Sequence, residues 1–385
     1  MNIEEIVPDA VAWRRHLHAE PELSFCEHRT AAFVRDVLES FGGLEVESPT
    51  PTSVVARLRG GRPGRTLALR ADMDALPIQE ESGVEFASRV EGVMHACGHD
   101  GHTASLLATA RLLSGMRVEL SGEVRFLFQH AEELPPGGAT ELIEAGVLKG
   151  VDAVVGCHLA SDLDVGKVAV LDGPCTAAAD TFFVRILGRG GHAAFPHTAI
   201  DPVAVAAQAI TNLQHVVART TPPLDSVVVS VTRIAGGTAD NIIPESTEFG
   251  GTVRTYRKEL RQSTRKTIDR TLSGVTAAHG ATYEFDYLEG YAPVVNDPTL
   301  VAVVREAAGA DRMVEYPPVM AGEDFSSYLS VAPGCFFFVG AGGKDAFPHH
   351  HPRFTIDERA LPIGIETMTQ TALSFLADTK IPDVG

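Results

Sequence analysis

Residues 94–102 read MHACGHDGH, and the rest of the chain can be organised around this stretch. Three histidines, one cysteine and one aspartate within nine positions are more than a segment needs in order to fold. Thiolate and imidazole groups are ligands that Zn²⁺ and the neighbouring late first-row metals prefer. The flexible Gly98 separates Cys97 from His99, so both side chains can reach one metal ion. The stretch therefore predicts a metal site, the alternative being a histidine-rich surface turn.

Three further segments carry residues of the same kind after predicted apolar strands. Residues 124–128 are followed by Glu132 and Glu133, residues 152–157 by His158, and residues 335–339, after a glycine-rich loop, by histidines 349–351. Helices predicted over 4–18, 27–40 and 103–114 alternate with these strands and with another over 66–70. This alternation predicts an α/β fold with a mostly parallel mixed sheet covered by helices. Ligands of such sheets bind beyond the carboxyl ends of the strands, so we expect the four segments to meet there.

The middle of the chain predicts a different order of strands and helices. It predicts, in order, a strand over 181–187, a helix over 201–219 with Asp201 as its N-cap, strands over 226–234 and 248–255, a helix over 258–279 and a strand over 282–288. The order β-α-β-β-α-β is that of a ferredoxin-like α+β domain. We therefore expect a second domain over residues 176–290, inserted into a metal-binding domain made of 1–175 and 291–385.

Glu132 and Glu133 allow two roles at one site. Adjacent carboxylates on an irregular loop can face different ways, so one can bind metal while the other accepts a proton. A two-metal site needs several ligands, a bridging group and an activated water. The Cys97 thiolate could bridge, with His99, Glu133, His158 and one late histidine completing two coordination shells. Glu132 would then take the proton from water. The alternative for the pair is a solvated acidic turn.

The inserted domain adds polar groups of its own. His192 lies in a glycine-flanked loop that can approach a ligand closely and could stabilise an oxyanion, although a structural hydrogen bond explains it equally well. Asn241 and Arg254 lie at predicted strand edges, where Arg254 could clamp a carboxylate or form a surface salt bridge. His16 and His18 are predicted to be solvated helix residues. Three carboxylates are candidates for orienting histidine ligands: Asp72, Asp74 and Asp100.

Composition narrows the functional class. The chain has 385 residues and a net charge of −18, with a pI of about 5.2, which argues against nucleic-acid binding. No apolar run is long enough to cross a bilayer, and residues 1–5 lack the basic and apolar regions of a secretory signal. The five cysteines are odd in number and widely scattered. This pattern predicts free thiols and a cytoplasmic location.

The motifs together resemble the M20 metallopeptidase family. The resemblance is closest to its amidohydrolase branch, which includes hippurate hydrolases, indole-acetyl-amino-acid hydrolases and N-acetyl-diaminopimelate deacetylases. It spans nearly the whole chain and rests on residues 14–18 (RRHLH), 21–24 (PELS), 70–77 (RADMDALP), 94–103 (MHACGHDGHT), 132–133 (EE), 190–194 (GGHAA), 241–244 (NIIP), 251–254 (GTVR), 323–325 (EDF) and 350–352 (HHP).

This resemblance implies a specific site. It implies metal ligands at Cys97, His99, Glu133, His158 and His350. His350 is preferred to His349 because it fits the family's His-x-Pro spacing with Pro352. The resemblance also implies that Glu132 is the general base. It further implies a homodimer formed through the smaller, lid domain, in which His192 reaches the partner's active site. The chain departs from the branch after His158, where Leu-Ala-Ser-Asp replaces a Trp-Pro-type segment, and at Gly322, which is often serine. These departures concern the substrate pocket.

We therefore expect a metal-dependent amidohydrolase. It would cleave the amide bond of N-acyl or N-aroyl amino acids into a carboxylic acid and a free amino acid, with Asn241 and Arg254 holding the substrate. Two divalent ions, drawn from Zn²⁺, Mn²⁺, Co²⁺ and Ni²⁺, suit the mixed sulfur, nitrogen and oxygen ligands. Three alternatives stay open: a metallo-dipeptidase or carboxypeptidase of the same family, a hydrolase with Cys97 as nucleophile, and a non-catalytic metal-containing binder of amino-acid conjugates.

Overall fold

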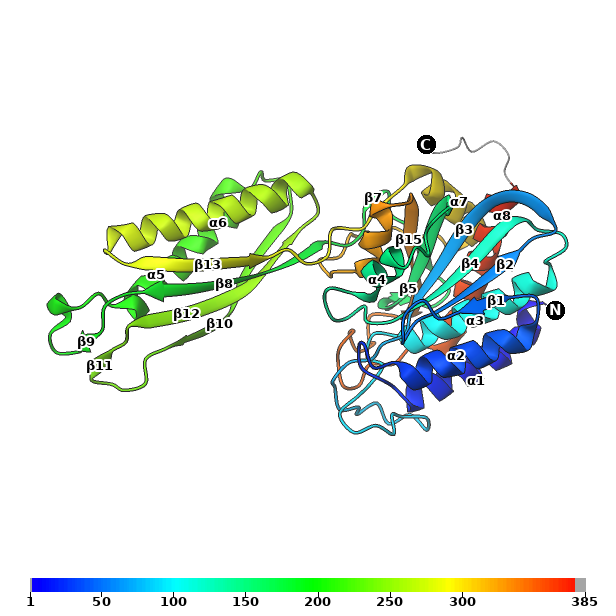
Figure 1. The fold of residues 1–385 in the computed structure, drawn as a ribbon, viewed down its shortest axis with the longest axis horizontal. Helices are drawn as coiled ribbons and strands as arrows, with labels where there is room; N and C mark the ends of the chain where they lie inside the picture. Colours follow the sequence, from blue (N-terminus) through cyan, green and yellow to red (C-terminus); the bar gives the residue numbers. More distant parts are fainter. Residues whose placement is uncertain (1, 378–385) are drawn as a thin grey trace. The chain divides into compact units, whose positions relative to one another are not determined.

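The computed structural model describes residues 2–377, which form two compact units (Figure 1). The first unit comprises the described residues of Met1–Cys175, Val294–Pro318 and Asp324–Gly385. The second unit comprises Thr176–Pro293 and Val319–Glu323. The second unit is thus inserted into the sequence of the first, and the chain enters it twice.

A seven-stranded mixed sheet forms the centre of the first unit. In spatial order its strands are β1 (Glu45–Glu47), β2 (Val54–Arg59), β4 (Ser121–Gln129), β3 (Arg62–Asp72), β5 (Ala153–Asp164), β15 (Gly334–Gly342) and β6 (Val168–Ala169). The four central strands β4, β3, β5 and β15 run parallel to one another, whereas β1, β2 and β6 join antiparallel at the two edges. The predicted mostly parallel mixed sheet is confirmed.

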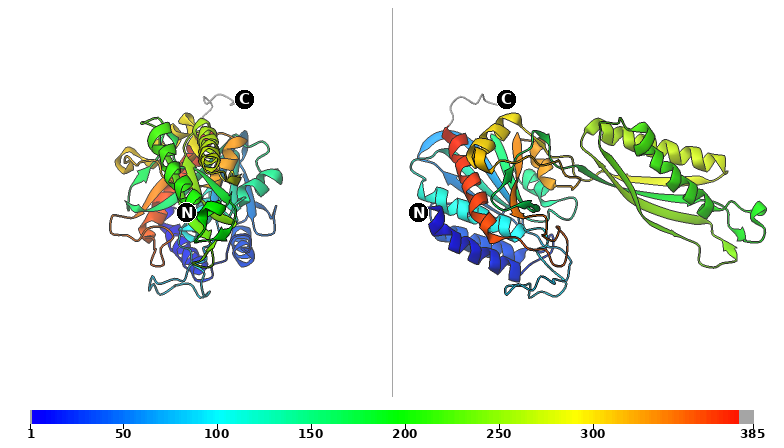
Figure 2. Two further views of the ribbon diagram at one scale, coloured as in Figure 1. Left: turned by 90° about the vertical axis from the view of Figure 1, so that its left-hand side faces the viewer. Right: turned by 180° about the vertical axis from the view of Figure 1, so that it is seen from behind.

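Helices cover this sheet. On one face lie α1 (Ile3–Ala19), α2 (His28–Phe41), α3 (His99–Gly115) and α8 (Leu361–Ala377), seen in front of the sheet in the back view of Figure 2. The helix α7 (Pro298–Ala308) packs against α8 and β15. The short helices α4 (Gly138–Glu144) and η4 (Asp324–Ser330) contact each other, and each also contacts a central strand. Because both faces are covered, every residue of β3 from Leu67 to Asp72 is buried.

Two elements differ from the prediction in a way that matters for the site. The third helix begins at His99, four residues before the predicted start. The prediction missed this first turn because its residues are poor helix formers. Gly98, with φ 89°, lets the chain turn in the left-handed region directly before it. The strand predicted to end before His158 instead continues to Asp164 as β5. Both His99 and His158 therefore lie on regular elements, which hold a side chain more rigidly than loops do.

The second unit is an antiparallel four-stranded sheet with two helices. Its strands lie in the order β10 (Val227–Gly236), β12 (Ser246–Thr255), β8 (Ala178–Leu187) and β13 (Thr282–Leu288). The helices α5 (Pro202–His215) and α6 (Lys258–Ala278) pack on this sheet around a core that includes Phe182, Phe249 and Ile268. As predicted, Asp201 caps α5, its carboxylate accepting the N–H groups of Val203 and Ala204. The predicted β-α-β-β-α-β order is confirmed.

Smaller elements complete the two units. The first unit has the two-stranded ribbon β7 (Gly173–Pro174) and β14 (Val295–Asn296) and the single turns η3 (Ala310–Arg312) and η5 (Glu358–Ala360). The second has the ribbon β9 (Gly191–His192) and β11 (Ile242–Ile243), with η1 (Pro196–Thr198) and η2 (Val216–Thr220). Among residues 2–377, no helix combines the length and the hydrophobicity that a membrane span needs.

Candidate metal centre

The five predicted ligands come from four separate elements of the first unit. Cys97 precedes α3 and His99 is its first residue, Glu133 follows β4, His158 lies in β5, and His350 lies in the loop after β15. The backbone N–H of His350 donates to Ala96 O (2.8 Å), which ties the late loop to the segment that carries Cys97. The parallel strands β4, β5 and β15 thus bring residues far apart in sequence to one side of the sheet.

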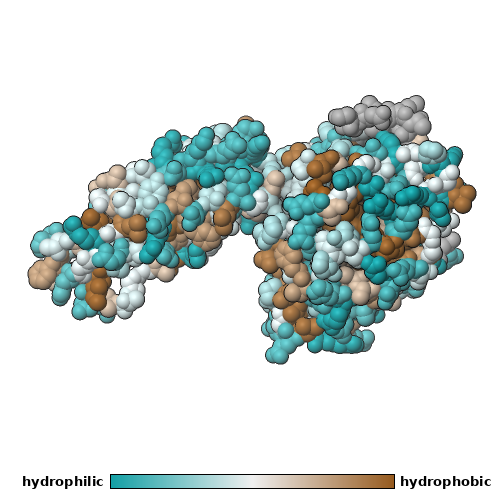
Figure 3. Space-filling model, viewed as in Figure 1, coloured by the Kyte–Doolittle hydropathy of each residue, from teal (hydrophilic) through white to brown (hydrophobic). Residues whose placement is uncertain are grey.

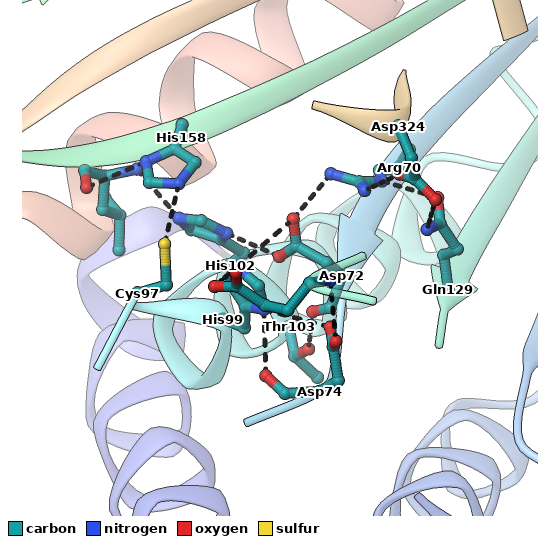
Figure 4. A network of polar contacts seen from close by, with 12 residues as sticks. Arg70, Asp72, Asp74, Cys97, His99, His102, Thr103, Gln129, His158 and Asp324 are labelled. Carbon is teal, nitrogen blue, oxygen red and sulfur yellow. Dashed lines mark hydrogen bonds and ion pairs between the residues drawn. The ribbon is translucent and has the colours of Figure 1, made fainter. Parts of the chain in front are cut away.

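The ligand atoms of these residues gather in three overlapping sets. The sets are Cys97 with His99 and His158, Cys97 with Glu133 and His350, and His99 with Glu132 and Glu133. Within each set all candidate ligand atoms lie within 4.8 Å of one another. Cys97 belongs to two of the sets, and so does Glu133. The five residues and the adjacent Glu132 therefore form one continuous cluster, part of which Figure 4 shows.

The cluster has a polar atom that the protein alone leaves unsatisfied. Among the described residues, His99 Nε2 is buried and has no hydrogen-bond partner. It faces Glu133 Oε1 at 4.0 Å, too far for a hydrogen bond, and that carboxylate oxygen contacts His350 Nε2 instead (3.1 Å). Buried polar atoms normally have partners, so the unpaired His99 nitrogen calls for a ligand. Imidazole, carboxylate and thiolate around this position fit a divalent transition-metal ion.

Backbone contacts aim two of the histidines at the cluster. His99 Nδ1–H donates to the carbonyl oxygen of Asp74 (2.9 Å) and lies 3.2 Å from its carboxylate. His158 Nδ1–H donates to Leu159 O (3.1 Å), while its Nε2 lies 3.5 Å from Cys97 Sγ. In both rings Nε2 is therefore the atom available to a metal. Burial lowers the pKa of His158 well below its usual range, which keeps the ring neutral.

Two of the candidate ligands, Cys97 and His350, have raised pKa values and so keep protons that a bound cation would displace. Burial, and then the nearby Glu133 carboxylate, raise the pKa of the Cys97 thiol. Hydrogen bonding to Cys97 and to Glu133 raises the pKa of His350 to about 10. His350 Nε2 lies 3.1 Å from Glu133 Oε1. Because metal ligands bind in their deprotonated forms, we expect a divalent ion to compete with these protons.

His349 lies beside the cluster in a different role from His350. Its Nε2 accepts the backbone N–H of Ser161 (3.3 Å), which leaves its Nδ1 facing Cys97 Sγ at 3.8 Å. Burial lowers the pKa of His349 to about 4. The ring is therefore neutral with its proton on Nδ1, directed at the sulfur, and it can donate to a thiolate but has no lone pair aimed at a metal.

The three predicted second-layer carboxylates serve different partners. Asp74 orients His99 and also accepts the backbone N–H of Glu133 (3.0 Å). Asp72 accepts from His102 Nδ1 (2.6 Å), and His102 Nε2 accepts the N–H of Leu159 (2.8 Å). His102 thus uses both ring nitrogens to hold β5 next to His158. Asp100 points away from the cluster, toward His18 Nδ1 (2.9 Å) and Arg14 Nε (2.7 Å).

The prediction that His18 is solvated was wrong. His18 is fully buried on the face of α1 that packs against α3, between Asp100 and Glu80, whose carboxylate lies 3.1 Å from Nε2. Burial would lower the pKa of His18, but the carboxylates of Asp100 and Glu80 together outweigh it, and the pKa is raised. His16, two residues earlier and therefore on nearly the opposite side of the helix, is exposed as predicted.

A buried polar network that sequence reasoning missed supports the site from the β3 side. Arg70 donates to Asp72 (2.6 Å), to Gln129 Oε1 (2.9 Å) and to Asp324 (2.8 Å), and Gln129 Nε2 donates to Asp324 (2.7 Å) (Figure 4). Arg70, Asp72 and Asp324 are 0–1% exposed. The available signal was a charged residue inside the apolar strand 66–70, since charges are rarely buried without partners.

The remaining candidates lie in the second unit, at opposite ends of its sheet. His192 is exposed in the ribbon β9–β11, where its backbone pairs with Ile242, and Asn241 is exposed beside it, its carbonyl accepting the N–H of Ala193 (3.0 Å). Arg254 lies near the end of β12, paired with Ala179 at the start of β8, and is half-buried. Burial lowers its pKa. Within one copy of this unit, His192 and Arg254 therefore do not form a single site.

Comparisons with known proteins agree with the chemistry of the cluster. Residues 68–374 match the peptidase family M20/M25/M40. The chain is 57% identical over 294 residues to an N-acyl-L-amino acid amidohydrolase of Geobacillus stearothermophilus, a match that covers 76% of this chain and 80% of that protein. It is 41% identical over 382 residues to thermostable carboxypeptidase 2 of Saccharolobus solfataricus, with 97% of each chain covered.

A solved structure shares the whole fold. Bacillus subtilis protein YXEP, described as a dinuclear metal binding peptidase from the M20 family, matches with a TM-score of 0.87 and 40% identity, over 97% of this chain and 99% of that one. The family match spans most of the sequence, and these relatives are similar over most of their length. The chain therefore belongs to peptidase family M20/M25/M40, and it is a hydrolase that acts on amide bonds.

Proposed function

We propose that this member of the M20/M25/M40 family hydrolyses the amide bond of N-acyl or N-aroyl amino acids, releasing a carboxylic acid and a free amino acid. One observation carries the proposal: Cys97, His99, Glu133, His158 and His350 form a single cluster, with the buried Glu132 next to it. The substrate class is supported by the 57% identity to an N-acyl-L-amino acid amidohydrolase.

The five residues are the proposed holders of two divalent ions. Cys97 belongs both to the set with His158 and to the set with Glu133 and His350, so its thiolate would be a ligand in either set. Zn²⁺, Mn²⁺, Co²⁺ and Ni²⁺ all accept this mixture of ligands. When bound, such a pair supplies polarisation of the substrate carbonyl and lowers the pKa of water at the site. The half-exposed His350 leaves the cluster open to solvent on its own side.

Glu132 is the proposed general base. It is 6% exposed, adjacent to the ligand Glu133, and within the set that includes His99. Its carboxylate takes a proton from the water whose oxygen attacks the amide carbon. It then returns that proton to the nitrogen as the carbon–nitrogen bond breaks. The products are the carboxylic acid, which carries the water oxygen, and the amine of the free amino acid.

The second unit supplies the proposed substrate contacts. His192 would stabilise the oxyanion, in the active site of a partner subunit, while Asn241 and Arg254 would hold the substrate. A homodimer through this unit is supported by its exposed large apolar side chains, which are Phe195, Val203, Leu224, Ile234, Ile242 and Leu288. Figure 3 shows brown, hydrophobic residues among the hydrophilic ones on the surface of this unit. Within residues 2–377 no strand pairs with the outer edge of β10 or of β13, and such edges can pair across a two-fold axis.

A peptidase activity is the second candidate. The chain is 41% identical to a protein named thermostable carboxypeptidase 2. The same base and ligands would serve a peptide substrate, since a peptide is also an N-acyl amino acid. A hydrolase with Cys97 as nucleophile is disfavoured, because the raised pKa of this thiol opposes thiolate formation without a metal.

The test combines metal reconstitution with a substrate panel. The purified protein is freed of metal, loaded separately with Zn²⁺, Mn²⁺, Co²⁺ and Ni²⁺, and assayed on N-acetyl amino acids, N-benzoyl amino acids and dipeptides. We expect activity only after loading, two ions per chain at saturation, and the highest kcat/KM on acylated amino acids. A clear preference for dipeptides would favour the peptidase. Metal binding without turnover of any member would favour a binding protein.

A further inference from the structure

The buried carboxylate of Glu27 has no role in the site described above. Glu27 is the residue directly before α2, a position where a carboxylate usually caps its own helix. Here its side chain makes no cap hydrogen bond. Glu22 takes that role, its Oε2 accepting from Thr30 N (2.8 Å) and Thr30 Oγ1 (3.0 Å). The Glu27 side chain is therefore turned away from its own helix.

Glu27 instead contacts the residue that precedes the catalytic pair. Its Oε1 accepts the backbone N–H of Ala131 at 2.7 Å, across 104 positions of sequence. Ala131 has φ 49°, in the left-handed region that residues other than glycine seldom adopt. Such a conformation persists only where its surroundings hold it. The hydrogen bond that the Ala131 N–H donates to Glu27 is one of the contacts that hold Ala131 in this conformation.

We infer that Glu27 is a positioning residue for hydrolysis, which fixes the backbone of Ala131 and thereby the directions of Glu132 and Glu133. The loop is held at three points around this pair. Ala131 N–H donates to Glu27, Ala131 O accepts from Gly138 N (3.1 Å), and Glu133 N–H donates to Asp74 (3.0 Å). Glu132 lies between the held groups. A displacement of about 1 Å at a catalytic group can cost about 10²-fold in rate.

The burial of Glu27 supports a purpose beyond packing. The side chain is 0% exposed, and Glu27 Oε2 has no hydrogen-bond partner among the described residues. Burial, and then the Asp74 carboxylate, raise the pKa of Glu27 to about 7. A buried carboxyl group with one oxygen left without a hydrogen bond costs stability relative to an apolar side chain of similar size. Residues retained against such a cost cluster at functional sites.

The experiment compares Glu27→Gln with Glu27→Met. Both replacements are neutral and close to glutamate in size, but only glutamine keeps an oxygen that can accept the Ala131 N–H. Hydrogen–deuterium exchange is measured on the metal-free proteins for the peptide that spans residues 130–134. kcat and KM are then measured on the metal-loaded proteins with an N-acyl amino acid. Glu22→Ala is the matched control, because it weakens the start of α2 without touching Ala131.

In Glu27→Met we expect faster exchange over 130–134 and a kcat lowered by about 10- to 100-fold, with KM changed far less. Glu27→Gln should stay close to the wild type in both measurements, and Glu22→Ala should lower the unfolding temperature without lowering kcat. Should Glu27→Met fail to fold, Glu27→Asp, which is one methylene too short, is expected to behave as predicted for Met.

The inference is overturned if Gln and Met give equal exchange and equal kcat, or if Met changes only the unfolding temperature. The inference rests on the proposed function, but the two can fail separately. A wild-type protein that hydrolyses no member of the panel refutes the function. The exchange comparison on metal-free protein still decides whether Glu27 holds the loop.

Discussion

The two units present their candidate residues in opposite ways. In the first unit, hydrogen bonds to neighbouring residues fix the candidate ligands in place. Asp74 accepts from His99 and from the backbone of Glu133, and Leu159 O accepts from His158. In the second unit His192 and Asn241 lie on a two-stranded ribbon, beside Phe195 and Ile242, which are 54% and 55% exposed. One site is built in advance by the fold. The other presents apolar surface that a substrate or a second subunit would cover.

Because of this difference, substitutions in the two sets of residues should have different effects. Prebuilt sites keep their geometry because a second layer of contacts fixes the rotamers. The loss of such contacts should therefore lower both the rate of the reaction and the stability of the fold. Exposed residues on a short ribbon contribute little to folding, so their replacement should alter turnover alone.

Removal of the metal should abolish activity in the prebuilt site. We expect a strong chelator to reduce turnover to background, and two equivalents of a suitable ion to restore it. The metal-loaded protein should also unfold at a higher temperature than the metal-free protein, since ligands that bind only the folded state stabilise it. Cys97→Ala should bind fewer ions per chain, as measured by elemental analysis. Activity that survives complete metal removal and is lost on thiol alkylation would instead support Cys97 as the nucleophile.

Replacement of the base should separate chemistry from metal binding. Glu132→Gln is expected to lower kcat by about 10²- to 10⁴-fold, the usual contribution of a general base, with two ions still bound. The measurement is steady-state kinetics together with metal content. Glu133→Gln is the matched comparison, because it should lower the metal content as well. Normal turnover of a fully loaded Glu132→Gln protein would refute the assignment.

His192→Ala tests the role of the exposed residues in the second unit. We expect kcat to fall by about 10²- to 10³-fold, as for loss of one oxyanion donor, with the unfolding temperature unchanged. His197→Ala, exposed on the same loop, should leave both quantities unchanged. Mixing the His192→Ala and Glu132→Gln proteins should restore part of the activity if His192 acts across subunits. No restoration in mixed dimers would confine His192 to its own chain.

The smallest expected effect concerns a buried histidine away from the metal. The pKa of His18 is raised in the folded protein, so its stabilising contribution is full below the unfolded pKa near 6.5 and is lost as the pH rises through the folded value. The difference in unfolding free energy between the wild type and His18→Gln should therefore shrink from pH 5.5 to pH 8.5. His16→Gln, exposed on the same helix, should show no such trend in chemical denaturation. A difference that grows with pH would contradict the raised pKa.

Much of the fold followed from periodicity and strand order. The parallel sheet, the β-α-β-β-α-β insertion and the Asp201 cap all rest on local patterns. Metal-type residues after predicted strands marked the cluster, because parallel strands place their carboxyl ends together. The start of α3 was missed because residues 99–102 carry chemistry at the expense of helix propensity.

Buried polar partnerships could not be predicted in the same way. Arg70 meets Asp324 across 254 positions, and His18 meets Asp100 across 82. A lone charged or polar residue in an amphipathic pattern looks solvated until its distant partner is known. The strands β1 and β2 and the helices α7 and α8 were also not predicted. Of these, α8 packs against α3.

The insertion has a consequence for biosynthesis. All strands and helices of the second unit lie between residues 178 and 288, so a ribosome delivers them before it makes β15 and α8. β15 occupies a place inside the first sheet, next to β5, and His350 follows it. Domains fold as units while the chain is still growing. The unit that holds the amino-terminal helices is therefore completed later than the one nested within it, and the set of candidate ligands is complete only once translation has passed residue 350.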